Sequence, residues 1–350
     1  MKKKLFIMAL PTVTCMLAGC YLTAGSPKIR GGSYASASLM TNFQGPGDLG
    51  QHGSFREGNG QVYTCRAGHI DLAHLRKSAD YTRYFAKKIF TYLMEGKSNF
   101  TLRMRAPSLY LIQLDYPEKW ENLSQQQKQQ IAWNASIGLG AYISYTGMTW
   151  HEILTWFGFR STLIAPETAS TFTWEDNFSN LLGAHIAGKA LNNIAEHSFN
   201  KSLFNKSMTS ALKEELSQLG IQPAGIAKRT SERMNGTWYS TAGIYVTMKK
   251  MNLDIGFDDG YVTPWIVPDV AECNGAKPKP YPIPTTDFLR QYGFSIELQI
   301  EPRIRGGEKI LWMVGKTKTV EPQVDFPIIV KRIRAQAAKK YNNSGVDYPF

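Results

Sequence analysis

An aspartate and a histidine three residues apart, Asp71 and His74, form the clearest chemical pair in the sequence. We expect both on a helix, where residues three apart share a face. A carboxylate beside an imidazole orients the ring and raises its basicity, which suits a general base and also a metal ligand. The alternative is a helix start with an acid in its first turn and a histidine at the surface.

A second pair, His151 and Glu152, lies in an apolar and aromatic stretch. It matches the start of the His-Glu-x-x-His motif of zinc hydrolases, but the fifth position is Thr155, so that motif is absent. Glu152 also fits a capping box with Thr149, which predicts a helix start there. The pair is interpreted either as a proton donor or metal-binding group, or as part of a helix cap.

A third group follows Thr173 and contains Glu175, Asp176 and His185. The helix dipole and a capping box with Thr173 account for Asp176, so Glu175 is retained as the candidate site acid. His185 lies among apolar and small residues, which favours a core histidine over a metal ligand.

The distribution of these residues is more informative than any one of them, because four of the six histidines fall in three predicted helices with acids nearby. Helix bundles build acid–base and metal sites from such facing side chains. We therefore predict a site made of Asp71, His74, His151, Glu152 and Glu175. The cofactor is unknown; a divalent metal is one option, with His74, His151 and His185 as candidate ligands.

The region from 61 to 236 is predicted to form a mainly helical body. Helices are predicted from 70 to 94, from Ser124 onward, from Thr149 to Gly158, from Thr173 to about 195, and from Ser207 to Gly220, with strands in 99–115. Residues 131–150 carry no charge, but their polar side chains and three glycines favour a buried core helix over a membrane span.

The region from 237 to 350 has a different character, with clustered prolines and an alternating strand pattern at 294–301. Residues 310–314 are predicted to pair with that strand through a turn at Gly306 and Gly307, and residues 328–341 to form a basic helix. The chain is therefore predicted to be mainly helical α+β, with a small β-containing C-terminal part packed on the body.

The N-terminus predicts export and a lipid anchor. Three lysines precede an uncharged apolar run, and residues 17–20 read Leu-Ala-Gly-Cys, which resembles the lipobox of bacterial lipoproteins. The resemblance implies removal of residues 1–19, acylation of Cys20 and attachment to a membrane. Tyr21, in place of Asp, favours the outer membrane, facing the periplasm. Residues 20–60, rich in Gly, Ser and Ala, are predicted to form a flexible tether.

Export from the cytoplasm bears on the redox state of Cys65 and Cys273 and on the class of binding partner. In an oxidising compartment Cys65 and Cys273 fit a disulfide, and the alternative is a nucleophilic Cys65 near His69. The formal charge is +12, and about +9 remains without the three N-terminal lysines. Anionic lipid or an envelope polymer therefore suits this chain as a partner, whereas export argues against nucleic acid. The basic tail is either a solvated helix face or one that meets anionic lipid.

Four segments together resemble a family of bacterial envelope lipoproteins known only as a domain of unknown function: residues 70–80, 149–158, 175–183 and 254–265. The resemblance covers most of 60–340 and implies no established activity. Two hypotheses follow. One is an envelope hydrolase or group-transfer enzyme with His74 as general base. The other is a non-catalytic envelope assembly or polymer-binding lipoprotein.

Overall fold

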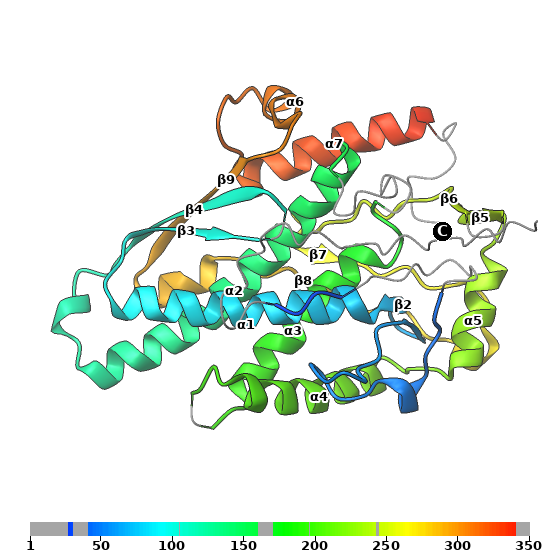
Figure 1. Cartoon of the computed structure of the whole chain (residues 1–350), viewed down its shortest axis with the longest axis horizontal. Helices are drawn as coiled ribbons and strands as arrows, with labels where there is room; N and C mark the ends of the chain where they lie inside the picture. The colour runs from blue at the N-terminus through cyan, green and yellow to red at the C-terminus, as the bar shows by residue number, and fades with distance from the viewer. Residues whose placement is uncertain are drawn as a thin grey trace, which may run out of the picture.

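Glycines set the crossings of three long helices, α1 (Leu72–Met94), α2 (Gln125–Trp156) and α3 (Asp176–Asn192). A Cβ atom at Gly140 of α2 would clash with the backbone of α1 at Thr82, and one at Gly183 of α3 would clash with Leu75. Both glycines therefore allow close approach to α1. The three helices form the centre of the molecule in this computed structural model (Figure 1). Residues 27–30, 41–104, 106–159, 171–195, 197–242 and 245–340 are described.

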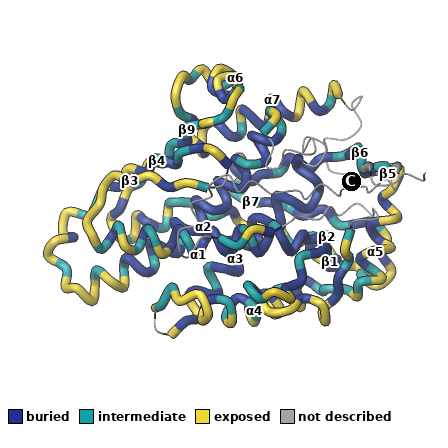
Figure 2. Tube along the Cα trace, in the orientation of Figure 1, coloured by how far each residue is buried: buried dark blue, intermediate teal, exposed yellow. Residues whose placement is uncertain are grey.

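Helix α2 confirms one predicted start and refutes another. Ser124 and Gln127 form the predicted capping box. No helix starts at Thr149, because α2 runs unbroken to Trp156 and its backbone groups are bonded within the helix. The uncharged part of α2 is buried in the core (Figure 2). Within the described residues, no helix combines the length and apolar character that a membrane crossing requires.

Further helices follow along the chain. Helix α4 (Lys201–Gln218) begins six residues before the predicted start at Ser207, because Asn200 accepts hydrogen bonds from the first backbone N–H groups. The others are α5 (Ala224–Arg233), α6 (Gly307–Met313) and α7 (Pro322–Lys340). Among the described residues, short 3-10 segments are found at Pro46–Asp48, Trp120–Asn122, Ala271–Cys273 and Asp287–Tyr292.

An antiparallel sheet of three strands pairs two strands from the first half of the chain with one strand from its last quarter. Its order is β3 (Asn99–Arg103), β4 (Ser108–Asp115) and β9 (Ser295–Pro302), with Leu111 of β4 opposite Gln299 of β9. The C-terminal strand therefore completes the core of the body. Three two-stranded pairs complete the list: β1 (Gln61–Thr64) with β2 (Gly68–Asp71), β5 (Tyr239–Ala242) with β6 (Tyr245–Met248), and β7 (Tyr261–Val262) with β8 (Tyr281–Pro282). The predicted class, mainly helical α+β, is confirmed.

The predicted strand at 310–314 is wrong, because residues 307–313 form α6. Ile310 and Leu311 are buried while Trp312 points to solvent, a pattern that a short helix produces as readily as a strand. The neighbour of β9 is instead β4.

The predicted flexible tether also needs correction, because residues 27–30 and 41–60 pack against the body. The buried Arg30 binds Glu57 and Asp80 at 2.8 Å and 2.7 Å, and the fully buried His52 lies 3.1 Å from Asp80 on α1. Arg76 donates to the backbone oxygens of Leu49 and Gly58. Buried ion pairs thus hold this glycine-rich stretch against the body.

The charges of this network are mutually dependent. Burial alone would raise the pKa of Asp80, but a hydrogen bond to His52 and the Arg30 charge hold it well below its usual range. Burial acts in the same direction on Glu57, yet hydrogen bonds with Arg30 and Lys28 lower its pKa to about 2. Both acids are therefore ionised in the folded protein at neutral pH.

Replacing Asp80 by Asn should lower the free energy of unfolding by about 3 kcal/mol, because the buried Arg30 would keep only one of its two carboxylate partners. Urea unfolding measures this, with Glu214→Gln as the control, since the Glu214–Lys189 pair is exposed and contributes little. The wild type should also lose stability as the pH falls from 4.5 towards about 2, the interval over which Glu57 is protonated only in the unfolded chain. Equal losses in the two variants would refute the role given to the network.

Candidate functional site

Asp71 lies where strand β2 passes into helix α1, and its carboxylate caps that helix. One oxygen, Oδ1, accepts from the backbone N–H groups of Ala73 at 2.6 Å and His74 at 3.2 Å. The backbone N–H of Asp71 donates to Ser179 Oγ of α3 at 2.9 Å. The other carboxylate oxygen, Oδ2, lies 2.9 Å from His74 Nδ1. The capping role and the chemical pair, posed as alternatives from the sequence, are therefore both present in one side chain.

Asp176, the first residue of α3, reaches the same imidazole nitrogen from the other helix. Its Oδ1 lies 3.5 Å from His74 Nδ1, and its Oδ2 accepts from the backbone N–H of Thr173 at 3.0 Å. The His74 side chain is 19% exposed, whereas both carboxylates are buried. Within the described part of the chain, Nε2 of His74 has no hydrogen-bond partner. One face of the ring is thus fixed by two acids, and the opposite nitrogen remains available.

The two acids determine the charge of His74. Burial alone would lower the pKa of the imidazole, but the negative charges of Asp71 and Asp176 raise it to about 9. At neutral pH the ring is therefore an imidazolium that carries a proton on both nitrogens. Such a group donates a proton through Nε2; it is not a base.

Glu152, in the last turns of α2, adds a third carboxyl group to this region. Its side chain is buried, and Oε2 accepts from the backbone N–H of Phe172 at 3.3 Å. Burial and the charge of Asp176 raise the pKa of Glu152 to about 8, while the positive charge of His74 opposes the rise. The pKa of Asp176 is raised too, by burial first and also by the charge of Asp71. Asp176 and His74 therefore shift the pKa of Glu152 in opposite directions.

Phe172, which donates to Glu152, has a backbone conformation that is rare for its residue type. Its φ angle is +53°, in the left-handed region that favours glycine. The residue is fully buried, and its carbonyl oxygen accepts from the N–H of Asn252 at 3.0 Å. Strained backbone of this kind persists only where surrounding contacts hold it, and it is concentrated at functional sites.

Sequence reasoning selected Glu175 for the site, whereas the structure brings Asp176 to His74. Glu175 points elsewhere, and its Oε1 accepts from Gln61 Nε2 at 3.3 Å. The capping pattern of Thr173 and Asp176 accounts for Asp176 without any chemical role. A cap uses one carboxylate oxygen, however, and the second oxygen of Asp176 lies beside His74 Nδ1, as does that of Asp71.

His151 does not share the face of Glu152. Adjacent residues on an α-helix point about 100° apart, since one turn takes about 3.6 residues. Glu152 is buried, while His151 is half-buried and packs edge-on against Phe159, with ring centroids 5.7 Å apart. The expected cooperation of the two neighbours is therefore not supported by their directions.

His185 is separated from His74, contrary to the predicted metal-ligand set. It lies nine residues beyond Asp176 on α3, about 13 Å along the helix axis. Its Nε2 lies 2.6 Å from the carbonyl oxygen of Pro282, its ring packs against Tyr281, and burial lowers its pKa. Among the residues whose positions are described, no group of three or more His, Cys, Asp and Glu side chains could hold a metal ion. The donor set therefore does not fit the proposed divalent metal.

Cys65 is joined to Cys273 by a disulfide, the pairing first considered from the sequence. A sulfur atom in a disulfide is not a thiolate, so the alternative of a nucleophilic Cys65 is excluded in this state. The neighbouring His69 is a core residue: its Nε2 contacts the carbonyl oxygen of Ala227 at 3.1 Å, and burial lowers its pKa to about 4.

Comparison with known proteins identifies a family but no activity. The model of the family described as "Protein of unknown function (DUF4056)" matches residues 41–254, more than half of the chain, and the chain therefore belongs to that family. This agrees with the expected membership in a family of unknown function. No curated protein and no solved structure matches the chain.

Replacing Asp176 by Asn should move the pKa of His74 from about 9 towards 6.5, because one of two negative charges at Nδ1 is lost. Two-bond proton–nitrogen NMR spectra of the imidazole measure this titration. Glu175→Gln is the matched control, since it neutralises the adjacent acid and should leave the titration in place.

A wild-type His74 that titrates near 6.5 would contradict this electrostatic description. The raised pKa of His74 also makes the stability of the fold depend on pH. The stabilisation from protonated His74 is fully present below pH 6.5 and is lost as the pH rises through about 9, where the folded protein also releases the proton.

Proposed function

We propose that this protein is a membrane-anchored envelope enzyme that hydrolyses, or transfers a group from, a lipid or cell-wall polymer by acid–base catalysis. The observation that supports it most is His74. Two buried carboxylates hold its Nδ1 at 2.9 Å and 3.5 Å, and Glu152 lies within electrostatic reach. Pairs of groups whose surroundings push their pKa values away from the ordinary ones are characteristic of acid–base sites.

His74 acts as the general acid in this proposal. The sequence suggested a general base, but a pKa of about 9 keeps the proton on the ring at neutral pH. Nε2–H would donate to the leaving oxygen or nitrogen as its bond to the substrate breaks. Asp71 and Asp176 orient the ring and stabilise its positive charge.

Glu152 acts as the general base. A carboxylate with a pKa near 8 is a stronger base than an ordinary one, so it accepts the proton of an attacking water or hydroxyl group more readily. The hydroxyl oxygen then attacks the substrate, and the proton on His74 leaves with the departing group. Catalysis needs Glu152 ionised and His74 protonated, which favours mildly alkaline pH, between about 8 and 9.

The envelope location is supported by the basic N-terminus, the apolar run and the lipobox ending at Cys20. The packing of residues 27–30 shortens the tether considered from the sequence. Residue 27 is only seven positions after Cys20, so the chain reaches at most about 25 Å between the lipid and the body. The substrate would therefore lie at the membrane face, most simply that of the outer membrane. Cys20→Ala should abolish incorporation of radioactive palmitate, and persistent labelling would refute the anchor.

A non-catalytic envelope lipoprotein is the alternative, and the two roles of the buried acids sharpen the distinction. Asp71 caps α1 whether or not chemistry takes place, so its loss would reduce stability under both hypotheses. His74 and Glu152 cap no helix in the structure, which makes them the informative positions.

Replacing His74 or Glu152 by Gln should reduce turnover by at least about a hundredfold, because each variant lacks one proton-transfer group. Mass spectrometry of products released from envelope phospholipids and from cell-wall polymer measures this loss. The exposed His197→Gln is the matched control. The His74 variant should lose less stability at pH 9 than at pH 7, because the charge of His74 contributes less as the pH approaches its pKa of about 9. Full activity in both variants, or a wild type inactive on both substrate classes, would refute the proposal.

A further inference from the structure

Helix α6 presents a tryptophan almost entirely to solvent. The exposed fraction of Trp312 is 82%, while its neighbours Ile310 and Leu311 are buried and attach the helix to the body. Helix α6 lies at the upper edge of the molecule, away from the candidate site on α1 and α3 (Figure 1). A large aromatic side chain in this position contributes little to the fold, and tryptophan is enriched at contact surfaces.

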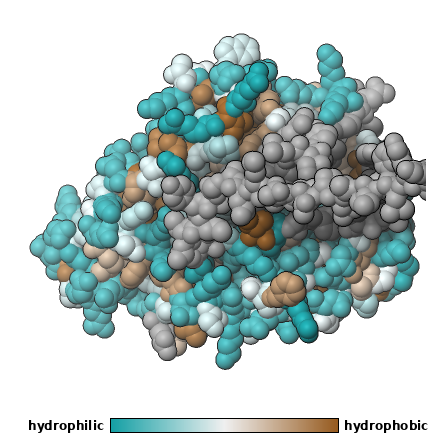
Figure 3. Space-filling view, in the orientation of Figure 1, coloured by the Kyte–Doolittle hydropathy of each residue, from teal (hydrophilic) through white to brown (hydrophobic). Residues whose placement is uncertain are grey.

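The segment around Trp312 carries exposed positive charges, which outnumber its one acid, Glu308. Arg305, Lys309 and Lys318 are exposed, and none of them forms an ion pair with another described residue. Lys309 lies three residues before Trp312 and therefore shares its face of α6. The segment 303–340 contains ten Lys and Arg residues against three acids, so it carries much of the chain's net charge of +12. Hydrophilic side chains predominate at this end of the space-filling view (Figure 3).

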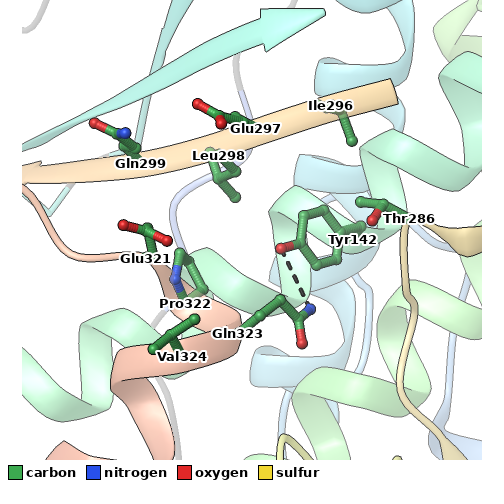
Figure 4. Close-up of a pocket in the computed structure, with 10 residues that line it drawn as sticks. All are labelled: Tyr142, Thr286, Ile296, Glu297, Leu298, Gln299, Glu321, Pro322, Gln323 and Val324. Atoms are coloured by element: carbon green, nitrogen blue, oxygen red, sulfur yellow. Dashed lines mark hydrogen bonds between the residues drawn. The ribbon is translucent and has the colours of Figure 1, made fainter. Parts of the chain in front are cut away.

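A nearby groove differs in charge and is a separate feature. It has a volume of about 210 Å³, and its walls are strand β9 and the start of α7 (Figure 4). Glu297 and Glu321 line it, and Gln323 donates to Tyr142 Oη across it at 3.4 Å. Its acidic lining makes it unsuited to an anionic ligand, so the groove is not part of the basic surface.

We propose that residues 303–318, with Trp312 at their centre, dock on an anionic phospholipid bilayer. Tryptophan rings favour the interface between lipid headgroups and acyl chains, and lysines and arginines are attracted to a negative surface. A soluble polyanion would use the cations but would leave the indole in water. The bilayer is the partner that uses both features, and it also fits a chain with a short N-terminal anchor.

Vesicle co-sedimentation tests the surface without the anchor. The probe is a chain that starts at Cys20→Ser, mixed with vesicles of phosphatidylcholine alone or with a third of phosphatidylglycerol. We expect binding only to the anionic vesicles, and weaker binding at higher salt. Arg305→Glu with Lys309→Glu should weaken binding about tenfold or more, since four units of charge are lost. Trp312→Ala should weaken it about fivefold.

Matched controls exist elsewhere on the surface. Phe55 is fully exposed in a loop outside α6 and α7, and Phe55→Ala should leave binding unchanged. Lys206→Glu with Lys213→Glu on α4 makes the same charge change and should have a much smaller effect. Because His74→Gln should bind vesicles like the wild type, failure of this surface and failure of the proposed catalysis can be told apart.

Equal binding of the two vesicle types would overturn the proposal. So would equal losses in the α6 and α4 charge variants. If Trp312→Ala binds like the wild type while the α6 charge variant does not, the ligand is a soluble or polymeric anion and the bilayer assignment is wrong.

Discussion

The close crossing of α1 and α3 at Gly183 is the constraint on which the candidate site depends. A side chain at this position would clash with the backbone of Leu75, one residue after His74. The contact lets the first turn of α3 approach the first turn of α1, so that Asp71 and Asp176 meet at one imidazole nitrogen. Ser179, four residues before Gly183, completes the junction by accepting a hydrogen bond from Asp71.

Two helix starts thus supply the site with oriented carboxylates. Each acid uses one oxygen to satisfy backbone N–H groups and directs the other oxygen towards His74. Hydrogen bonds from backbone N–H groups fix both carboxylates. Placing two negative charges beside the His74 ring therefore costs little additional side-chain entropy. Glu152 comes from the end of a different helix and lies at the strained turn around Phe172. The site is therefore built where three elements begin or end, and the middle of each helix is left for packing.

Local patterns predicted most of the elements. The spacing of apolar residues indicated α1 and α3, the Ser124 capping box indicated the start of α2, and strict alternation indicated β9. Two errors came from patterns that have two physical solutions. Thr149 and Glu152 fit a cap but lie inside a continuous helix, and the short apolar run at 310–314 fits a strand but forms α6. Packing against distant parts of the chain decides which of the two structures forms, and a short stretch of sequence carries no information about that packing.

The site itself was accessible from the sequence only in part. Asp71, His74 and Glu152 were identified from residue types and spacing, whereas Asp176 was set aside because capping explained it. The ion pairs of Arg30 with Glu57 and Asp80 join positions 27 and 50 residues apart, so no sequence period could indicate that this lead-in packs on α1.

The proposed acid–base site requires the positive charge of His74 to act on the pKa of Glu152. Infrared difference spectra between the wild type and Glu152→Gln report directly on the protonated carboxyl group of Glu152 as the pH is varied. The account predicts a protonated Glu152 at neutral pH that ionises near pH 8, and a still higher pKa in His74→Gln, where the opposing positive charge is removed. A Glu152 that is ionised at neutral pH, or a titration unchanged by His74→Gln, would contradict it.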